Sequence, residues 1–203
     1  MKVALLGATG KAGSRLVKEL VSRGHEVTAI SRHPEKVEGH KQVKAVQGDV
    51  HSEEALAKIL AGHNAVIHAV RFVDTNPAKV IAATKQAGVP RLLVVGGAGS
   101  LEAAPGLAVV DTPSFPAAVR PEALAGAEFL KMLRAEKALT WTFLSPSAIF
   151  APGERSGKFR LGKDKLLVAE DGKSHISMED FAIAFVDELE RPQHNGERFT
   201  VGY

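Results

Sequence analysis

The chain has 203 residues, of which 45% are hydrophobic and 24% are charged, and its formal net charge is +3. These values are typical of a soluble globular protein, and we expect residues 1–203 to form a single domain with a substantial core. The sequence contains no uninterrupted run of about 18 apolar residues, so we expect no membrane span. The absence of cysteine excludes disulfides, thiolate catalysis and cysteine-based metal sites, and no metal is expected.

The distribution of charge bears on partners and location. The excess of lysine and arginine is spread along the chain, and aromatic residues make up only 5% of it. A nucleic-acid interface needs a basic stripe with base-stacking aromatic residues, so we expect no nucleic-acid partner. The first residues have the pattern of a strand rather than of a signal peptide, so a cytoplasmic protein is expected, as a monomer or a homodimer.

The first 23 residues carry the most informative motif. An apolar run at residues 2–6 meets Gly7, Gly10 and Gly13, and a helical pattern follows over residues 14–23. Gly7 permits a tight turn, Gly10 lets a pyrophosphate approach the backbone, and Gly13 lets the helix pack on the strand. The helix N-terminus then attracts the phosphate charge. This pattern predicts a dinucleotide site, and the alternative is an ordinary strand–helix turn. In the predicted site the cofactor contacts Gly7, Thr9, Gly10, Lys11 and Ala12.

Strand and helix patterns alternate through the first two thirds of the chain. Further strands are predicted at residues 27–30, 43–46, 65–70 and 91–95, and helices at 52–60 and 77–87. Such alternation predicts a parallel sheet with right-handed crossovers and helices on both faces. The predicted fold is therefore α/β, a doubly wound parallel sheet of the Rossmann type.

The spacing G-x-x-G-x-x-G, with Ala-Thr between the first two glycines, resembles the extended and atypical short-chain dehydrogenase/reductase superfamily. The resemblance implies that Asp49 and Val50 contact the adenine after the third strand. It also implies that the ribose and phosphates pass the end of the fourth strand, at Ala69, Val70 and Arg71. Asp49 could instead mark the entry to a helix. His68 is expected to be a packed core histidine.

The end of the second strand predicts which dinucleotide binds. An acid about 20 residues beyond the glycines would bind the ribose 2′-hydroxyl of NAD. Here the strand ends in Ser31 and Arg32, and the nearby acid, Glu26, begins the strand at the opposite edge. A planar cation suits a 2′-phosphate, so Arg32 with Ser31 predicts NADP(H). The alternative is a solvated charge at a strand end.

The later segments are expected to form a small C-terminal substrate lobe from about 101–121 and 151–176. Four prolines predict that residues 101–121 are not helical throughout, and long connections of this kind often bind ligands. The basic stretch 155–165 is interpreted as a solvated hairpin, with contact to an acidic substrate as the alternative. Ser177 with Asp180 predicts a helix cap, and the helix after it and a last strand at 198–201 are expected to be structural.

A catalytic pair common in the superfamily is missing. Most members use Tyr-x-x-x-Lys, in which the tyrosine transfers a proton. The single tyrosine here is Tyr203, with no lysine four residues after it, and the helix predicted near 121–137 has no tyrosine. Carbonyl reduction by this pair is therefore not expected. Flavins and quinones remain possible acceptors, because they need orientation and can take a proton from water.

A narrower resemblance covers nearly the whole chain. Residues 96–100, 141–147, 152–154 and 174–180 resemble the NAD(P)H-binding atypical reductases related to flavin reductase and biliverdin reductase B. The resemblance implies that two turns frame the nicotinamide, with Ser100 and Ser147 as candidate catalytic residues and Gly97, Ser145 and Pro146 as cofactor contacts. Ser147 stands where those reductases have a histidine. A proton relay that depends on this histidine is therefore not expected here. These serines could instead be turn residues at strand ends.

The sequence therefore predicts an NADPH-dependent reductase acting on a flavin- or quinone-like acceptor. An alternative from another class is an NADP-binding regulator or redox sensor of the NmrA-like kind, which binds the cofactor without turnover. A nucleotide-sugar epimerase or dehydratase is disfavoured by the missing pair and by the short C-terminal lobe.

Overall fold

A computed structural model describes residues 1–203 and has an α/β fold with a large, mostly parallel central sheet and five helices. This confirms the predicted fold class. The chain divides into two compact units, one of residues 1–94 with 136–141 and one of residues 95–135 with 142–203. Both segments of the predicted substrate lobe fall in the second unit. No helix has both the length and the apolar character needed to cross a membrane.

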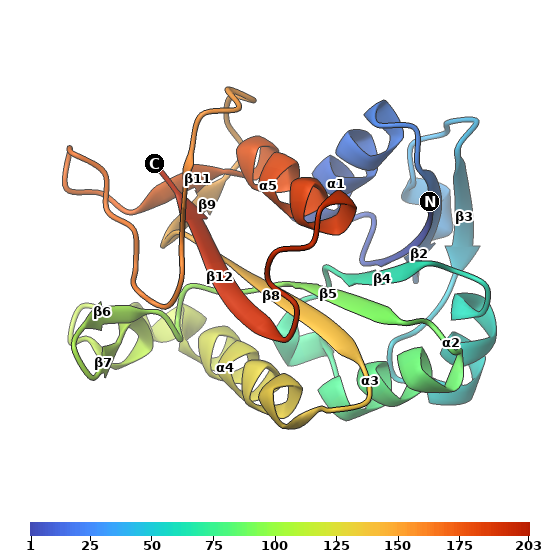
Figure 1. The fold of residues 1–203 in the computed structure, drawn as a ribbon, viewed down its shortest axis with the longest axis horizontal. Coiled ribbons are helices and arrows are strands. Elements are labelled where there is room, and N and C mark those ends of the chain that lie inside the picture. Colours follow the sequence, from blue (N-terminus) through green and yellow to red (C-terminus); the bar gives the residue numbers. More distant parts are fainter. The chain divides into compact units, whose positions relative to one another are not determined.

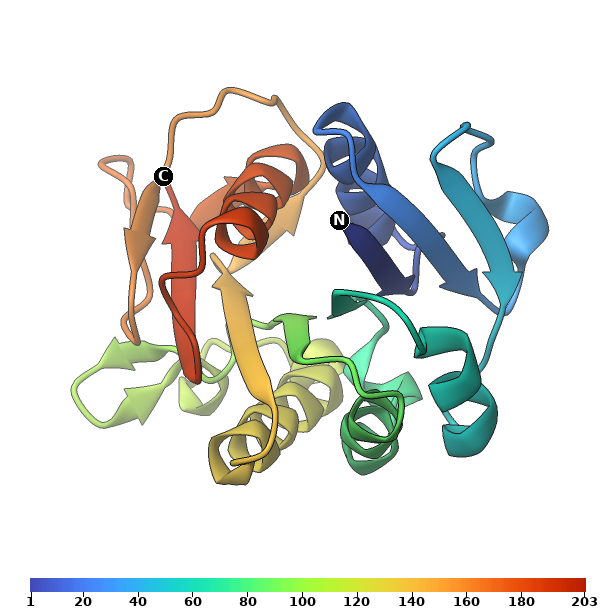
Figure 2. The ribbon, with the colours of Figure 1, turned by 45° about the vertical axis from the view of Figure 1, so that its right-hand side comes forward.

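The first unit contains the predicted alternation of strands and helices. Its strands lie in the order β5-β4-β1-β2-β3 and all pair in parallel. Helix α1 covers one face of these strands, and α2 and α3 cover the other (Figures 1 and 2). The elements are β1 (Lys2–Leu6), α1 (Lys11–Ser22), β2 (Glu26–Ser31), β3 (Val43–Gln47), α2 (Glu53–Leu60), β4 (Ala65–His68), α3 (Pro77–Gln86) and β5 (Arg91–Val95).

The central strands of this unit are buried on both faces. Residues 3–6 of β1 and all four residues of β4 are buried. Continuous apolar runs of this kind are what a parallel sheet covered by helices requires. Helix α1 packs Leu16 and Leu20, both fully buried, and each such leucine contributes about 1.5–3 kcal/mol relative to an exposed one.

The observed bounds differ from the predicted ones at two places near the predicted cofactor site. Helix α1 begins at Lys11 rather than Ser14, because Gly10 already occupies the N-cap position. Strand β4 ends at His68, so Ala69 and Val70 belong to the turn that follows it. Helix α3 is capped by Asn76, whose side chain accepts from the N–H of Lys79, and Gly88 ends it with a φ of 67°.

The second unit has three sheet strands in the order β10-β12-β8, in which β12 runs parallel to β8 and antiparallel to β10. Helix α4 lies on one side of β8 and β12, and α5 lies on the other (Figure 1). The strands are β8 (Thr140–Pro146), β10 (Arg160–Gly162) and β12 (Glu197–Gly202), and the helices are α4 (Arg120–Ala135) and α5 (Met178–Glu190). The predicted cap of α5 is present, because Ser177 Oγ accepts from the N–H of Asp180 at 2.9 Å.

Two small sheets and four short 3₁₀ helices complete the fold. Strand β9 (Ile149–Ala151) pairs with β11 (His175–Ser177), and β6 (Glu102–Ala104) pairs with β7 (Leu107–Ala108). As predicted, the 101–121 connection is not helical throughout. The 3₁₀ helices are η1 (Pro34–Lys36), η2 (Phe72–Asp74), η3 (Val109–Asp111) and η4 (Ala117–Val119).

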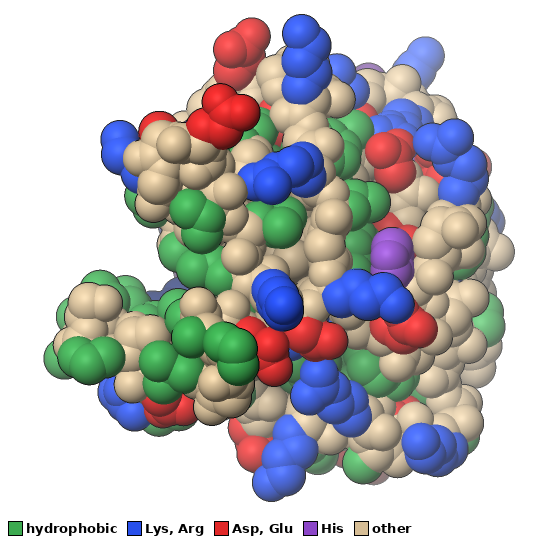
Figure 3. Space-filling view, turned by 60° about the vertical axis from the view of Figure 1, so that its left-hand side comes forward, with side chains coloured by type: hydrophobic (Ala, Val, Ile, Leu, Met, Phe, Trp, Pro, Cys, Tyr) green, Lys and Arg blue, Asp and Glu red, His purple; other side chains and the backbone are tan.

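The two segments of the predicted substrate lobe are joined by backbone hydrogen bonds. The N–H of Glu102 donates to the carbonyl of Asp164 at 2.8 Å, and the N–H of Leu166 donates to the carbonyl of Glu102 at 2.9 Å. Between residues 158 and 165 the four lysine and arginine side chains are exposed, and part of this stretch forms β10. Charges of both signs are mixed over the face of the molecule in Figure 3.

The buried histidine of β4 makes stability depend on pH. His68 is fully buried, and this burial lowers its pKa from 6.5 to about 3. Below pH 6.5 the unfolded chain therefore binds a proton that the folded chain does not. We expect the free energy of unfolding to fall by about 1.4 kcal/mol per pH unit from this group between about pH 6.5 and 3.

Urea unfolding at pH 7.5 and 5.5 measures this loss for the wild type, His68→Gln and His40→Gln. His40 is an exposed loop histidine, so its replacement should leave the loss in place. His68→Gln should lose about 1 to 2 kcal/mol less than the wild type between the two pH values. Identical losses in the wild type and His68→Gln would contradict the assignment.

Candidate functional site

The three glycines after β1 have different structural roles. Gly7 has a φ of +84°, and a Cβ there would lie 2.6 Å from the carbonyl oxygen of Ala69. A Cβ on Gly13 would overlap the carbonyl oxygen of Gly7. A Cβ on Gly10 would come no closer than 3.3 Å to the carbonyl oxygen of Gly7. The fold therefore requires Gly7 and Gly13, whereas Gly10 leaves room that a ligand can use.

The N-terminus of α1 matches a phosphate. Gly10 is the N-cap residue, no side chain caps the helix, and the first turn contains no acidic residue. The first N–H groups of a helix have no partner within it, and its dipole favours an anion there. Lys11 is exposed in this turn and Ala12 is half-buried. A pyrophosphate would supply the acceptors that the protein does not.

A cavity of about 210 Å³ opens beside this helix end. It is formed by the ends of β1 and β2 and by the segments that follow β3 and β4. Nine of the predicted cofactor residues line it together: Gly7, Thr9, Gly10, Arg32, Asp49, Val50, Ala69, Val70 and Arg71. Residues from four separate strand ends thus meet at one hollow, as expected at the carboxyl edge of a parallel sheet.

The end of β2 presents a free cation. The side chain of Arg32 is exposed and makes no hydrogen bond or ion pair within the protein. Its neighbour Ser31 is buried, with its Oγ 3.1 Å from Thr9 Oγ1 and accepting from the N–H of His33 at 3.1 Å. Ser31 therefore ties the glycine loop to the strand, and Arg32 alone is available to a ligand.

The position of Asp49 after β3 is compatible with both roles considered for it, cofactor contact and helix entry. Asp49 Oδ1 accepts from the N–H of His51 at 2.9 Å, which is the turn expected before a helix, and Asp49 also lines the cavity. Lys79 Nζ donates to the carbonyl of His51 at 2.8 Å, which fixes this segment to α3. His51 and Asp74 line the cavity without having been predicted, because no local motif marks them.

The remaining predicted residues lie in the second unit. Gly97 and Ser100 follow β5, and Ser145 and Pro146 end β8. The hydroxyl of Ser147 is buried and donates to the carbonyl of Val201 at 3.0 Å. Its proton is therefore engaged with backbone. A catalytic role for Ser147 stays a prediction.

Ser100 and Ser145 come together at a residue that the sequence analysis treated as structural. Arg198 Nη1, on β12, donates to Ser100 Oγ at 3.3 Å and to Ser145 Oγ at 3.5 Å. Its Nε and Nη2 donate to Asp164 Oδ1 at 2.9 and 2.6 Å. The signal that could have revealed it is an arginine directly before the uncharged run Phe199–Gly202 of the same strand.

The single tyrosine is engaged at the start of α5. Tyr203 Oη lies 2.7 Å from Asp180 Oδ2 and 3.0 Å from Ser177 Oγ, and burial followed by the bond to Asp180 raises the pKa of the phenol. Helix α4 contains no tyrosine. The Tyr-x-x-x-Lys pair is therefore missing from the structure as well as from the sequence.

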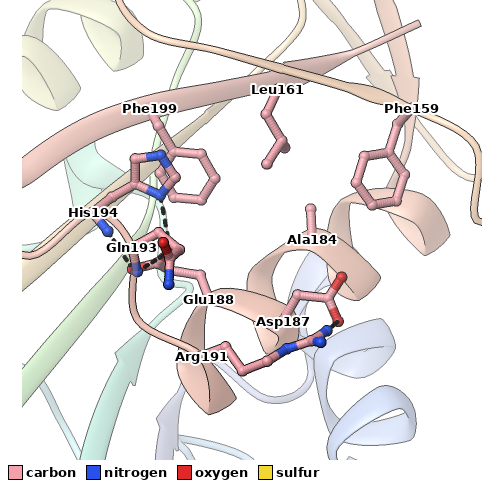
Figure 4. A pocket seen from close by; sticks show the side chains of 9 residues that line it. All are labelled: Phe159, Leu161, Ala184, Asp187, Glu188, Arg191, Gln193, His194 and Phe199. Atoms are coloured by element: carbon pink, nitrogen blue, oxygen red, sulfur yellow. Dashed lines mark hydrogen bonds and ion pairs between the residues drawn. The ribbon is translucent and has the colours of Figure 1, made fainter.

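A second cavity, of about 320 Å³, lies between α5 and the strands β10 and β12 (Figure 4). Glu188 is buried there and accepts from the N–H of His194 at 3.0 Å, and His194 Nδ1 lies 2.9 Å from its Oε2. The His194 ring stacks on Phe199 with a centroid distance of 4.0 Å. These contacts fix the turn between α5 and β12, and no sequence motif marked this cavity.

Comparison with known proteins agrees with this geometry. A family model described as NAD(P)H-binding matches residues 7–192. The chain belongs to this NAD(P)H-binding family. It is 43% identical over 212 residues to the protein YwnB of Bacillus subtilis, which covers 99% of this chain and 98% of that protein.

Several solved structures cover all of this chain, and two of them have names that suggest different activities. One is the "putative epimerase" of Bacteroides thetaiotaomicron, with a TM-score of 0.95, 45% identity and 96% of its chain covered. The other is the "putative NADH-flavin reductase" of Streptococcus pneumoniae, with a TM-score of 0.84, 39% identity and 99% of its chain covered. The predicted Rossmann fold and the predicted NAD(P)H-binding family are confirmed, and the fold is that of an NAD(P)H-binding oxidoreductase.

Gly10 tests the glycine loop as the cofactor site. We expect Gly10→Val to raise the dissociation constant for NADPH by about tenfold or more, because its branched side chain occupies the space through which a pyrophosphate approaches. Gly39→Val makes the same change where nothing lies within 4 Å of a Cβ, and should leave the constant unchanged. Calorimetry measures both, and thermal unfolding checks that both variants fold. Normal binding by a folded Gly10→Val would exclude the loop.

Proposed function

We propose that this protein is an NADPH-dependent reductase that transfers hydride to a flavin- or quinone-like acceptor. The observation that carries the proposal is a cavity lined by the predicted cofactor residues, in a chain without the tyrosine–lysine pair that would protonate a carbonyl product. An enzyme with such a groove and no positioned acid suits acceptors that do not need one.

The preference for NADPH rests on Arg32. A 2′-phosphate carries charge that a planar guanidinium binds with two hydrogen bonds, and Arg32 has no competing partner in the protein. The acid that would bind the ribose diol of NADH is absent from the end of β2. Glu26 lies at the other end of that strand, in register with Lys2.

Most of the chemistry is positioning. NADPH, when bound, supplies the hydride, which carries two electrons. The end of α1 holds the pyrophosphate charge. Tyr203 and His68 are not positioned to give a proton, because the Tyr203 hydroxyl is bonded to Asp180 and His68 is neutral and fully buried. The single proton that completes the reduction comes from water.

The names of the two structural neighbours differ. Epimerases of the superfamily that this chain resembles use the tyrosine–lysine pair, so its absence disfavours the chemistry named for the Bacteroides protein. The Streptococcus protein is named for flavin reduction, which needs no such pair. A regulator that binds NADPH without turnover is the alternative from another class, and the acceptor assay below distinguishes it.

Cofactor choice tests the role of Arg32. We expect NADPH to bind about ten- to a hundredfold more tightly than NADH, from one charge-assisted contact. Arg32→Asp should abolish or invert this preference. Lys36→Asp makes the same charge change on an exposed residue outside the cavity and should preserve it. Equal dissociation constants for the two cofactors in the wild type would refute the assignment.

An acceptor panel tests the reaction itself. NADPH oxidation should be rapid with FMN, riboflavin or menadione and slow with simple aldehydes, whose reduction needs a positioned acid. Tyr203→Phe should leave the rate with the good acceptor nearly unchanged. NADPH binding without turnover of any acceptor would favour the regulator. Rapid aldehyde reduction, or a large loss of rate in Tyr203→Phe, would overturn the proposed mechanism.

A further inference from the structure

The predicted cofactor cavity has two walls that come from strands far apart in the sheet. The β3 wall is residues 48–51, which follow β3, and the β4 wall is residues 69–75, which follow β4. Strands β1 and β2 lie between β3 and β4. Neighbouring strands lie about 4.8 Å apart, which places β3 about 14 Å from β4. The spacing of the walls therefore decides whether a ligand over the ends of β1 and β2 contacts both of them.

Each wall is stiffened by its own hydrogen bonds. In the β3 wall, Asp49 Oδ1 accepts from the N–H of His51 at 2.9 Å. In the β4 wall, Thr75 Oγ1 donates to the carbonyl of Arg71 at 2.9 Å and lies 3.0 Å from Nε2 of the buried His68. These bonds fix the shape of each wall, but they do not join one wall to the other.

The side chain of Lys79 joins the two walls. Helix α3 follows the β4 wall, and Lys79 lies in its first turn, with Nζ donating to the carbonyl of His51 on the β3 wall at 2.8 Å. The backbone of the same residue is also held, because its N–H donates to Asn76 Oδ1 at 3.3 Å. The Lys79 side chain is half-buried and has no acidic partner. Through α3, Lys79 therefore connects the β4 wall to the β3 wall.

The electrostatics of α3 do not account for a lysine at this place. The N-terminus of a helix carries partial positive charge, so acidic residues are favoured in the first turn and cations are not. The first turn of α3 contains no acidic residue and has Lys79 instead. The bond to the carbonyl of His51 is the contact that its ammonium group gains there.

We propose that Lys79 is a positioning residue that fixes the spacing of the two walls and thereby tightens the binding of the dinucleotide. This inference rests on the cofactor site of the proposed function and deepens it. Lys79 does not line the cavity, so it acts through His51 rather than by contact with the ligand. Arg32, to which the 2′-phosphate is assigned, lies at the end of β2 and outside both walls. The loss of Lys79 should therefore weaken NADPH and NADH by the same factor.

The order of the strands indicates which half of the cofactor meets the β3 wall. Helix α1 follows β1, Arg32 follows β2, and β3 pairs with β2 on the side away from β1. A dinucleotide that extends from the N-terminus of α1 to Arg32 places its adenosine half toward the β3 wall. Adenosine 2′-monophosphate contains that half and lacks both the pyrophosphate and the nicotinamide. It is therefore the probe for this end of the cavity.

Three variants test the assignment by calorimetry: Lys79→Met, which removes the donor, Lys79→Arg, which supplies another, and Lys85→Met as a control. Lys85 lies on the same helix, pairs with Glu136 at 3.1 Å and does not line the cavity. We expect Lys79→Met to raise the dissociation constants of NADPH, NADH and adenosine 2′-monophosphate by about three- to tenfold, the loss expected for one hydrogen bond. Lys79→Arg should bind all three more tightly than Lys79→Met, and Lys85→Met should keep the wild-type constants.

Amide hydrogen exchange in the protein without cofactor provides a second readout. Residues 48–51 should exchange faster in Lys79→Met than in the wild type, because the β3 wall loses its attachment to α3. Lys85→Met should leave exchange at these residues unchanged. If Lys79 served only the stability of α3, the unfolding temperature would fall while the dissociation constants stayed the same. If its charge attracted the phosphates from a distance, NADPH would lose more affinity than NADH, and added salt would reduce the difference.

The outcomes separate this inference from the proposed function. Unchanged dissociation constants in Lys79→Met, or a loss confined to NADPH, would overturn the role of Lys79 and leave the cofactor site in place. A wild type that binds neither NADPH nor NADH would overturn both. A wild type that binds NADPH but reduces no acceptor would overturn the reductase alone, because the role of Lys79 is measured by binding. If Lys79→Met does not fold, Lys79→Ala replaces it, since alanine favours the helix and has no donor.

Discussion

The close approach of two backbone segments determines the shape of the predicted cofactor cavity. The turn at Gly7 lies against the carbonyl of Ala69 after β4, and α1 packs on the turn so closely that Gly13 has no room for a side chain. These contacts fix the direction of α1, so its uncapped N-terminus points to the cavity. Gly10, Arg32 and Asp49 meet there because the strands that carry them pair in parallel. This steric constraint therefore brings the N-terminus of α1 and the Arg32 side chain to the same cavity.

In the second unit, buried side-chain hydrogen bonds add to the backbone bonds that join its two irregular segments. Arg198 links β12 to Ser100 after β5, to Ser145 on β8 and to Asp164 in the exposed segment. Asp180 is buried at the start of α5 and accepts from Ser156, from the N–H of Gly157 and from Tyr203. The two clusters hold different parts of the exposed stretch 156–164, at Ser156 and Gly157 and at Asp164. The predicted substrate lobe is therefore held by side-chain hydrogen bonds, although its strands and 3₁₀ helices are short.

The features predicted from sequence are those encoded locally. Glycine spacing, strand periodicity and the Ser177 cap depend on residues close together in the chain, and their elements were found within a few residues of the predicted bounds. Arg32 was identifiable because its place follows from the end of one strand. Arg198 was not, because its partners lie 34 to 98 residues away. His51 and Asp74 were missed for a similar reason, since only tertiary packing brings their loops to the cavity.

The position of β12 within its sheet bears on the order of folding. Residues 197–202 insert between β8 and β10. On the ribosome, β8 and β10 are therefore synthesised before β12, the strand that pairs with both and lies between them. Until then β8 lacks the neighbour that β12 provides, and an unpaired strand edge is a site for aggregation. Strands β1 to β4 emerge early and pair among themselves, β2 with β1 and β3, and β4 with β1. Yield during expression should thus depend on how quickly the last strand is captured.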